Sequence, residues 1–557
     1  MRFFLCSLFM CAFHGTSSAQ VQGGLPWESV SFPGGREVQR FESKTYLGRP
    51  WHYAACIDVV GDIDGDGVRD FAVMNGDPNH PSLAIEIYSG RDLVLVYVLE
   101  SLAGPEAFVA GVGDIDQDGC DDVAVCYDKA HNGVVRIYSG GNGTVLRDLN
   151  VLGEPAPAGD LNADGVPDIL VQSTTTRAFS GVDGSLLHEF EGGNQWYILF
   201  GGEESAPLGD VNGDGHDDVA ISDPEARHSS LGQSVGIVRV YSGHDGALLW
   251  HMDGPEQYSV LGRAIAAYPD QDGDGADELL VSFSDRDQEG WLRNRIQCFS
   301  GASGQLLFEL ETSMFDLQYV AIETVPDCDG DGAPDILVGR FLRTFEGMDF
   351  KFVTLPEGAV YLYSGATREI MHRFGPPTDL RYRGVGYSVG GLGDTNGDGH
   401  GEILFNSMHF DGGLFFIESS VQVWSFESHL VLNRDSISAS AGGTLRMSLD
   451  FPVTHAAQPY RLLFSGRLGG LTRHGVDIPL ARDPLFEASL LGNYPMPDQG
   501  KLSGVLNGAG NDRVRIDIPP GALNSLIGMT YEIAAVVIPS GQLAIASSVA
   551  RRLTVLP

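Results

Sequence analysis

The fold is decided by an acidic stretch of nine residues, seen clearly at positions 210–218 as Asp-Val-Asn-Gly-Asp-Gly-His-Asp-Asp and followed directly by the apolar run Val-Ala-Ile-Ser. Stretches of this pattern are separated by 52, 46, 50, 60, 57 and 67 residues and begin at Asp62, Asp114, Asp160, Asp210, Asp270, Asp327 and Asp394. A motif that recurs at intervals of roughly 50–60 residues indicates a repeat architecture, in which each repeat is one supersecondary unit.

Each repeat reads as four short strands, because a second signal follows the acidic stretch. A Gly- and Ala-rich run leads into that stretch, an aliphatic run follows it, and a third run ends in an aromatic-Ser-Gly turn before the fourth. The turn occurs at residues 88–90, 138–140, 179–181, 241–243, 299–301 and 363–365, and in degenerate form at 424–426. Four short strands are typical of one blade of a β-propeller, and each unit is too poor in apolar residues for a core of its own. We therefore predict an all-β fold with a seven-bladed β-propeller over residues 20–430.

The seventh repeat ends near Phe426 without a convincing fourth strand. Residues 36–42, which precede the first acidic stretch, resemble the strand that follows an aromatic-Ser-Gly turn in the other repeats. We expect this segment to complete blade seven, since such a closure removes the open sheet edges that invite pairing with other chains.

The acidic stretch has the residue pattern of a calcium loop. Positions 1 and 5 are always Asp, position 3 is Asp or Asn, position 6 is Gly, and position 9 is Asp or Glu. Side chains at positions 1, 3, 5 and 9 and the carbonyl of position 7 offer hard oxygen ligands, which favour Ca²⁺ over zinc or copper. Position 12 lies inside the following strand and is never Glu, which excludes an EF-hand.

We predict up to seven bound Ca²⁺ ions. The candidate ligands are Asp62, Asp64, Asp66, Val68, Asp70, Asp114, Asp116, Asp118, Cys120, Asp122, Asp160, Asn162, Asp164, Val166, Asp168, Asp210, Asn212, Asp214, His216, Asp218, Asp270, Asp272, Asp274, Ala276, Glu278, Asp327, Asp329, Asp331, Ala333, Asp335, Asp394, Asn396, Asp398, His400 and Glu402. Without metal the crowded carboxylates repel one another, so metal loading should be coupled to folding. The rings of His216 and His400, both at position 7, are expected to face solvent.

The acidic stretch and the aromatic-Ser-Gly strand end together resemble the FG-GAP repeats of the integrin α-subunit N-terminal propeller and the related VCBS repeats of secreted bacterial proteins. The resemblance covers roughly residues 30–430. It implies the propeller fold and calcium binding more firmly than it implies adhesion, because the FG element is blurred in repeats two and three and the GAP turn is absent as such.

Composition narrows the classes of partner. The chain has 557 residues, of which 74 are acidic and 35 basic, for a formal net charge of −39. This balance argues against nucleic acid or an anionic membrane surface as the main partner, because both attract clustered Lys and Arg. The five cysteines beyond residue 19 are scattered and form no disulfide framework or metal pair. We expect a monomer.

The two ends of the chain differ from the repeats. Arg2, the apolar run of residues 3–13 and the small residues 17–19 predict a signal peptide over 1–19, hence a secreted, cell-surface or periplasmic protein. Residues 431–557 contain β-like runs punctuated by turn residues, which predicts a small C-terminal β-sandwich as an accessory domain.

Two functions stay open on the sequence. The first is a non-enzymatic extracellular binding or adhesion module for a protein or glycan, using the loops opposite the calcium loops, which carry Trp51, Tyr53, Trp196, Tyr197, Arg227, Trp291, Arg340, Arg343 and Tyr382. The alternative is a calcium-dependent, lyase-like polysaccharide enzyme using that same face. The GxSxG match at residues 386–390 is discounted because it lies in the strand that leads into the seventh acidic stretch, not in a strand–turn–helix setting. No catalytic residue is assigned.

Overall fold

The structure is a computed structural model. It describes residues 35–42, 57–76, 83–100, 107–127, 133–173, 175–190, 205–224, 226, 235–256, 259–286, 292–310, 319–329, 331–341, 359–374, 383–395, 400–410, 416–426, 430–432, 434, 436–451, 456–466, 468–473, 476–491, 502–508, 511–538, 546–547 and 551–557. The predicted signal peptide lies outside these residues. Within them, no helix is both long and apolar enough to cross a membrane.

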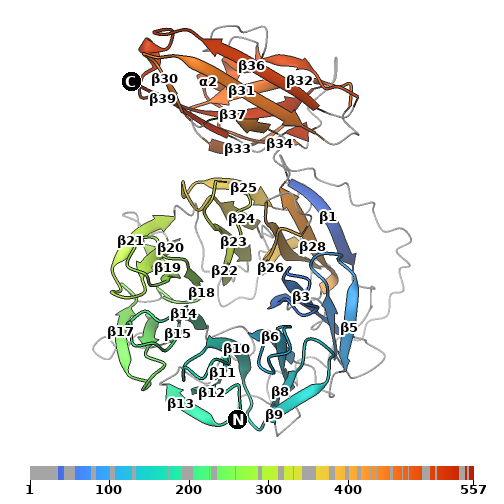
Figure 1. Ribbon diagram of the computed structural model, residues 1–557, viewed down its shortest axis with the longest axis vertical. Helices are drawn as coiled ribbons and strands as arrows, with labels where there is room; N and C mark the ends of the chain where they lie inside the picture. Colours follow the sequence, from blue (N-terminus) through green and yellow to red (C-terminus); the bar gives the residue numbers. More distant parts are fainter. Residues whose placement is uncertain are drawn as a thin grey trace, which may run out of the picture. The chain divides into compact units, whose positions relative to one another are not determined.

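The described chain is mostly β-strand, which confirms the prediction of an all-β fold (Figure 1). Seven sheets between residues 35 and 426 have four antiparallel strands each. The first three, in chain order, contain β2 (Ile57–Gly61), β3 (Asp70–Gly76), β4 (Leu83–Tyr88) and β5 (Leu95–Glu100); β6 (Ala107–Gly113), β7 (Asp122–Tyr127), β8 (Val134–Tyr138) and β9 (Val145–Leu149); and β10 (Glu154–Gly159), β11 (Asp168–Gln172), β12 (Thr176–Phe179) and β13 (Leu186–Phe190).

The next three sheets follow the same order. They contain β14 (Ser205–Gly209), β15 (Asp218–Asp223), β16 (Ile237–Tyr241) and β17 (Leu248–Asp253); β18 (Ile265–Tyr268), β19 (Glu278–Arg286), β20 (Leu292–Ser300) and β21 (Leu306–Leu310); and β22 (Tyr319–Val325), β23 (Asp335–Phe341), β24 (Ala359–Tyr363) and β25 (Ile370–Phe374). In each of these six sheets, consecutive strands pair as neighbours, so each sheet is a simple meander.

The seventh sheet combines two distant parts of the sequence. Its strands are β26 (Arg383–Gly393), β27 (Glu402–Phe410), β28 (Phe416–Phe426) and β1 (Gly35–Glu42). The early strand β1 pairs antiparallel with β28, from Gly35 opposite Phe426 to Glu42 opposite Ser420. Residues 35–42 therefore supply the fourth strand that residues 383–426 lack.

The first strands of the sheets lie against one another in a closed order. Strand β2 contacts β6, β6 contacts β10, and the series continues through β14, β18, β22 and β26 until β26 contacts β2. Seven buried apolar clusters follow this order, because each combines residues of two consecutive sheets, and the last joins the seventh sheet to the first. The sheets thus form their cores with their neighbours and not alone.

The second strand of each sheet explains the aliphatic run after each acidic stretch. In β11, Ile169 and Val171 pack in the cluster shared with the preceding sheet, whereas Leu170 packs in the cluster shared with the following sheet. Side chains along a strand alternate between its two faces, so consecutive residues in the middle of a strand that is covered on both faces are apolar. All five residues of β11 are buried.

Residues 430–556 form a different β structure. A three-stranded sheet contains β29 (Leu430–Leu432), β31 (Gly443–Asp450) and β36 (Asn511–Ile518). A larger sheet contains β30 (Ser436–Ser438), β39 (Arg551–Leu556), β37 (Thr530–Val537), β32 (Pro459–Ser465) and β35 (Ser503–Val505), with β38 (Ala546–Ser547) paired to β37. Both sheets contribute alternate side chains to one core, which includes Met447, Ile516, Phe464 and Ile533. The remaining elements are β33 (Leu468–Arg473), β34 (Val476–Leu480), α2 (Pro484–Leu490) and η4 (Asn524–Leu526).

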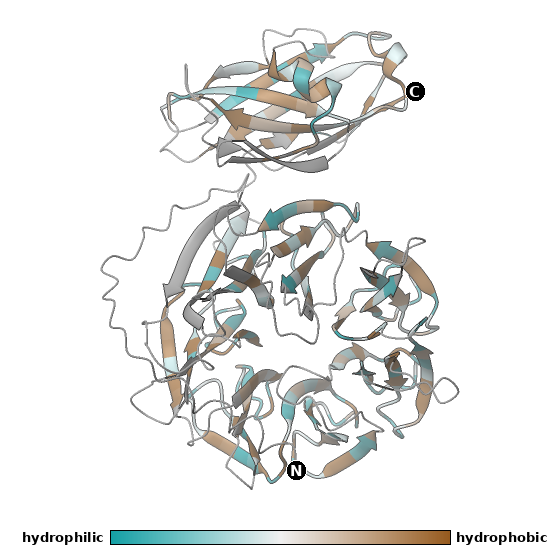
Figure 2. Cartoon of the chain, turned by 180° about the vertical axis from the view of Figure 1, so that it is seen from behind, coloured by the Kyte–Doolittle hydropathy of each residue, from teal (hydrophilic) through white to brown (hydrophobic). Residues whose placement is uncertain are grey.

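The inner and outer strands of the sheets differ in the solvent exposure of their apolar side chains. Figure 2 shows hydrophobic segments along strands throughout the chain, including the outer strands of the repeated sheets. Apolar side chains at the start of those outer strands are exposed, with Leu95 at 47%, Val145 at 49%, Leu186 at 51%, Leu248 at 48% and Leu306 at 53%. The apolar interior therefore lies between the sheets and not on their rim.

Candidate metal centres in the acidic loops

The seven acidic stretches connect the first and second strands of the seven sheets. We call them loops 1 to 7, for residues 62–70, 114–122, 160–168, 210–218, 270–278, 327–335 and 394–402. The chain turns here because Gly at position 6 adopts a left-handed conformation, with φ between 85° and 94° at Gly67, Gly119, Gly165, Gly215, Gly275 and Gly332. Only glycine visits this region routinely.

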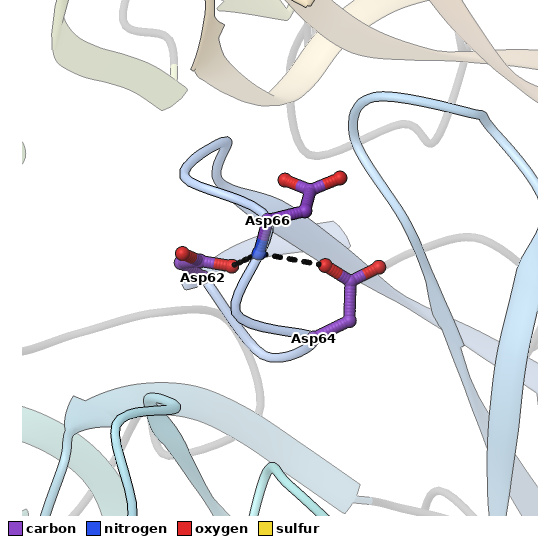
Figure 3. A group of neighbouring side chains, drawn as sticks. All are labelled: Asp62, Asp64 and Asp66. Atoms are coloured by element: carbon purple, nitrogen blue, oxygen red, sulfur yellow. Dashed lines mark hydrogen bonds between the residues drawn. The ribbon is translucent and has the colours of Figure 1, made fainter.

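In loop 1, backbone N–H groups gather the acidic side chains on one side of the turn. The Asp66 N–H donates to Asp62 Oδ1 at 3.0 Å and to Asp64 Oδ1 at 3.2 Å (Figure 3). The Gly67 N–H donates to Asp62 Oδ2 at 2.8 Å, and the Val68 N–H donates to Asp66 Oδ1 at 2.9 Å. A carboxylate has about four lone-pair sites, so these oxygens can accept the N–H groups and still face a cation.

The same pattern recurs in loops 2 to 6. The position-6 N–H donates to the position-1 carboxylate at 2.8–3.0 Å in every one of them. Where position 3 is Asn, the amide oxygen takes the place of the carboxylate: the Asp164 N–H donates to Asn162 Oδ1, and the Asp214 N–H donates to Asn212 Oδ1, both at 2.9 Å. The local sequence thus builds the same cage with either residue.

Four of the loops bring three carboxylates close enough to hold one metal ion. The groups are Asp62, Asp64 and Asp66 in loop 1; Asp114, Asp116 and Asp122 in loop 2; Asp270, Asp272 and Glu278 in loop 5; and Asp327, Asp329 and Asp335 in loop 6. The ligand oxygens of each group lie within 4.8 Å of one another. These clusters can therefore bind a metal ion, through positions 1, 3 and 5 in loop 1 and through positions 1, 3 and 9 in the others.

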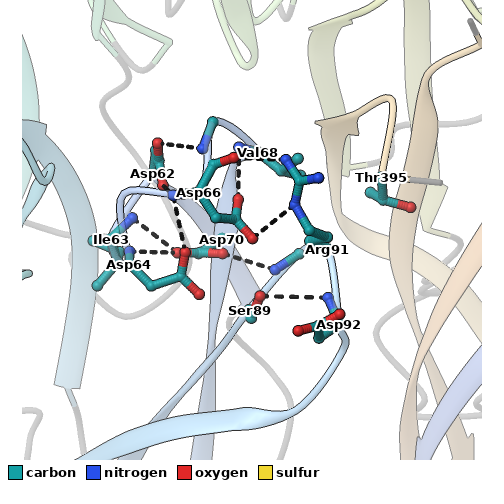
Figure 4. Close-up of polar contacts among 12 residues, drawn as sticks. Asp62, Ile63, Asp64, Asp66, Val68, Asp70, Ser89, Arg91, Asp92 and Thr395 are labelled. Carbon is teal, nitrogen blue, oxygen red and sulfur yellow. Dashed lines mark hydrogen bonds and ion pairs between the residues drawn. The ribbon is translucent and has the colours of Figure 1, made fainter. Parts of the chain in front are cut away.

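Position 9 has a second role that the sequence pattern did not reveal. Asp70 is fully buried, and its Oδ2 accepts the N–H groups of Ile63 at 2.8 Å and Asp64 at 3.2 Å (Figure 4). Its Oδ1 accepts the N–H of Gly90 at 2.7 Å, from the aromatic-Ser-Gly turn. The position-9 carboxylate therefore joins the acidic loop to a turn 20 residues later.

This connection is repeated in loops 2 to 6. The glycine N–H of the aromatic-Ser-Gly turn donates to the position-9 carboxylate at 2.8–3.2 Å in each, from Gly140, Gly181, Gly243, Gly301 and Gly365. These glycines also meet the position-8 carbonyl so closely that an added Cβ would lie 1.9–2.0 Å from its oxygen. The two sequence signals of each repeat are thus parts of one hydrogen-bonded unit.

Burial raises the pKa values of the position-9 carboxyl groups. Burial raises the pKa of Asp70 to about 7 and that of Asp335 to about 8, and the neighbouring Asp329 charge adds to the effect at Asp335. The pKa values of Asp122, Asp168 and Asp218 rise to about 6, again mainly through burial, while backbone hydrogen bonds act in the opposite direction. A nearby cation would favour the ionised form.

Position 5 is held by the same turn from its other side. The Ser364 hydroxyl donates to Asp331 Oδ2 at 2.9 Å, and Ser139 and Ser242 make the equivalent, longer contacts at 3.3 Å. In loop 1 the Arg91 Nε lies 2.9 Å from Asp66 Oδ2. The carboxylate at position 5 is therefore oriented by a partner from the third-to-fourth strand turn.

Neighbouring loops are linked through position 8, which sequence analysis passed over. Asp121 in loop 2 accepts the Asp62 N–H of loop 1 at 2.9 Å, and its own N–H donates to the Asp62 carbonyl at 2.8 Å. Asp217 and Asp160 repeat both contacts between loops 4 and 3. The sequence did contain a signal for this link, because position 8 is acidic in both loops although it is not one of the metal-ligand positions.

Two acidic residues on first strands, outside the loops, have raised pKa values. Burial raises the pKa of Asp58 in β2, and the charge of Glu323 raises it further. Burial also raises the pKa of Glu323 in β22, to about 7, while the charge of Arg69 lowers it. Their signal in the sequence was an acidic residue within the short run that precedes an acidic loop.

The expectation that the His216 ring faces solvent is wrong. The ring is half-buried, and its Nδ1 lies 2.7 Å from the Leu161 carbonyl oxygen while its Nε2 lies 3.1 Å from His244 Nδ1. The other position-7 residues differ in burial: Val68, Val166 and Ala276 are buried, whereas Cys120, Ala333 and His400 are half-buried. Position 7 tolerates this variety because only its carbonyl is needed as a ligand.

Loop 7 is described in part. Glu402 Oε2 accepts both the N–H of Thr395 at 2.6 Å and its hydroxyl at 2.8 Å, so position 9 keeps its role toward position 2. Asn396 and Asp398 lie outside the described residues, as do the face residues predicted for binding, with the exception of Arg340. The GxSxG match lies inside strand β26, where the Ser388 N–H donates to Asn406 Oδ1.

Four of the cysteines lie within the described residues. Cys126, Cys298 and Cys328 are buried and Cys120 is half-buried. The candidate functional groups of the repeated sheets are thus the oxygen ligands of the acidic loops, and each of these loops is hydrogen-bonded to a turn of its own sheet. Searches against models of protein families and against curated proteins find no match to this chain.

Proposed function

We propose that residues 36–426 form a seven-bladed β-propeller of the FG-GAP or VCBS kind, that its loops bind Ca²⁺, and that it serves as a secreted module binding a protein or glycan. The closed order of first strands and the seven clusters shared between consecutive sheets support the ring. A ring of this kind leaves no sheet without a neighbour, which accounts for the apolar run in each second strand.

Calcium is the ion that suits the loops best. The four acidic clusters offer only oxygen, and loops 3 and 4 replace one carboxylate by an amide oxygen. Oxygen-only ligand sets favour hard cations, and Ca²⁺ accepts more ligands and looser geometry than Mg²⁺. Extracellular calcium modules bind with dissociation constants of about 10⁻⁴–10⁻³ M, which fits an exported protein.

The observation that carries the functional proposal is the use of the loop oxygens. Both oxygens of Asp62 and both oxygens of Asp70 accept backbone N–H groups, so these carboxylates hold the loop and its turn together. An ion among them stabilises structure and is poorly placed to activate a substrate. We therefore assign binding, and not catalysis, to the protein, through loops other than the acidic ones.

The test applies the full exported chain to arrays of glycans and of extracellular proteins, once with calcium and once with EDTA. Mass spectrometry of the same protein counts the metal ions bound per chain. We expect several Ca²⁺ per chain and retention on at least one ligand that EDTA abolishes. Absence of stoichiometric calcium would refute the metal assignment, and absence of any retained ligand would refute the binding role. Incubation with acidic polysaccharides tests the alternative function, a lyase-like enzyme. Calcium-dependent release of unsaturated products would show that the protein is a lyase.

A further inference from the structure

Two histidines from different turns of one sheet meet beside loop 4. His216 occupies position 7 of the loop between β14 and β15, and His244 follows the aromatic-Ser-Gly turn between β16 and β17. His216 Nε2 and His244 Nδ1 are 3.1 Å apart, and the ring centroids are 4.5 Å apart with an interplanar angle of 47°. Their separation in sequence is 28 residues, so only the sheet brings them together.

The tautomer of His216 follows from its other contact. Its Nδ1 lies 2.7 Å from the carbonyl oxygen of Leu161, in loop 3. A carbonyl oxygen only accepts, so this nitrogen carries the proton and donates it. In the neutral ring, Nε2 then presents a lone pair toward His244. A histidine that ligates a metal usually donates its other ring N–H to a carbonyl or carboxylate in this manner.

The turn that carries His244 is supported from the neighbouring sheet. His188 in β13 places its Nε2 2.7 Å from the Gly243 carbonyl oxygen, next to His244 in the chain. The Gly243 N–H donates to Asp218 at 3.0 Å, which holds the same turn from the side of loop 4. The backbone next to His244 is therefore held from two sides.

The separation of the two nitrogens suits two ligands of one ion. Two nitrogens that each bind zinc at about 2.0–2.1 Å with tetrahedral angles lie about 3.3 Å apart, close to the observed 3.1 Å.

We propose that His216 Nε2 and His244 Nδ1 form a second kind of metal site, for a borderline divalent transition-metal ion such as Zn²⁺, with water completing the coordination. Imidazole nitrogen suits Zn²⁺, Cu²⁺ and Ni²⁺, whereas Ca²⁺ selects oxygen, so this site and the acidic loops take different ions. When zinc binds, His244 carries its proton on Nε2 and both lone pairs point to the ion. The loop-4 carboxylates lie on the same side of the sheet and attract cations.

The experiment is a calorimetric titration of the full chain with Zn²⁺ in excess calcium, which keeps the acidic loops occupied. The test variant is His244→Ala, because His244 is exposed and belongs to no acidic loop. The control is His251→Ala, an exposed histidine on β17 near Asp253. We expect one zinc site in the wild type and in the control, and at least about tenfold weaker binding in His244→Ala, since loss of even an outer partner costs about 10- to 100-fold.

A second readout separates this site from adventitious binding. Cu²⁺ bound to the wild type should show hyperfine coupling to two nitrogens in its electron paramagnetic resonance spectrum, and to fewer in His244→Ala and in His244→Gln. Equal zinc affinity in the wild type and His244→Ala, or no zinc site in the calcium-loaded wild type, would overturn the proposal. His244→Ala leaves every acidic loop unchanged, so a loss of zinc binding in this variant is distinguishable from a failure of the loops to bind calcium.

Discussion

Loop 1 and loop 4 share one hydrogen-bond pattern and differ in charge. In loop 1 the carboxylates of Asp62, Asp64 and Asp66 form one cluster, whereas in loop 4 position 3 is Asn212, which holds the same N–H contact without a negative charge. The position-9 residues make the same contacts to the loop and to the turn. The difference teaches that the shape of the loop comes from backbone hydrogen bonds, while its charge sets how strongly a cation is needed.

The largest expected effect is that of metal removal. EDTA should lower the melting temperature of the full chain, because each site that is occupied at 100 times its dissociation constant contributes about 2.7 kcal/mol. Hydrogen exchange should show Gly67 in loop 1 losing more protection than Gly215 in loop 4, since loop 1 has one more repelling carboxylate among its ligand positions. Equal protection of both amides before and after EDTA would contradict the role given to charge.

The next effect is common to both loops. Asp70→Ala and Asp218→Ala should each destabilise the calcium-loaded chain by about 3 kcal/mol or more, because each removes the acceptor of three backbone N–H groups, and buried unpaired groups cost about 1–3 kcal/mol each. Urea unfolding measures the loss. Asp183→Ala, at an exposed turn position, is the control and should change stability little. A large loss in only one loop would break the claim that position 9 has one role.

The glycine of the turn offers a test of packing alone. Gly243→Ala should destabilise by at least about 1–3 kcal/mol, the usual cost of overpacking, because the new Cβ would lie 2.0 Å from the Asp217 carbonyl oxygen. Gly508→Ala is the matched control, since its Cβ would meet no atom within 4 Å. Thermal unfolding in calcium compares the two, and equal midpoints would show that the turn can move away from loop 4 at little cost.

Stability of the metal-free chain should depend on pH in a direction that the pKa values set. Burial raises the pKa of Asp70 to about 7 and of Asp218 to about 6, so the folded chain binds these protons more tightly than the unfolded chain. The stabilisation of the folded chain by these two protonated carboxyl groups is fully present below about pH 4, and it is lost as the pH rises through 6 to 7. In EDTA the melting temperature should therefore fall from pH 5 to pH 8, and saturating calcium should reduce that fall. A rise over this range in EDTA would contradict the assignment.

The smallest expected effect comes from exchanging Asp and Asn at position 3 between the two loops, which moves one negative charge from loop 1 to loop 4. Asn212→Asp should tighten calcium binding at loop 4, and Asp64→Asn should weaken it at loop 1, because both residues keep the contact to the position-5 N–H. A charge added about 4 Å from a divalent ion in exposed surroundings gains roughly 1–2 kcal/mol, or about 5- to 30-fold in affinity. Calcium titration measures both. A change of the loop conformation, seen as lost protection of Gly215 or Gly67, would show that charge and shape are not separable.

Much of the repeated part could be predicted because its signals are local. The left-handed glycine at position 6, the alternation of ligand positions 1, 3 and 5, and the apolar second strand each depend on a few consecutive residues. The role of position 9 toward Gly90 could not be predicted in the same way, because it needs the pairing of β3 with β4 to bring two separated motifs together. The His216 ring was misjudged for this reason too, since its partners come from loop 3 and from the turn after β16.

The sequence by itself determined the strand order of each repeat, the acidic loops and their oxygen chemistry, since spacing along the chain already places those groups within one turn. Only the tertiary structure decided which distant residues those loops contact. These are a glycine in a later turn, a carboxylate in the next loop, and the histidine that pairs with His216 beside loop 4. The physical reason is that these contacts join strands whose neighbours are chosen by burial between sheets, and burial is a property of the assembled fold.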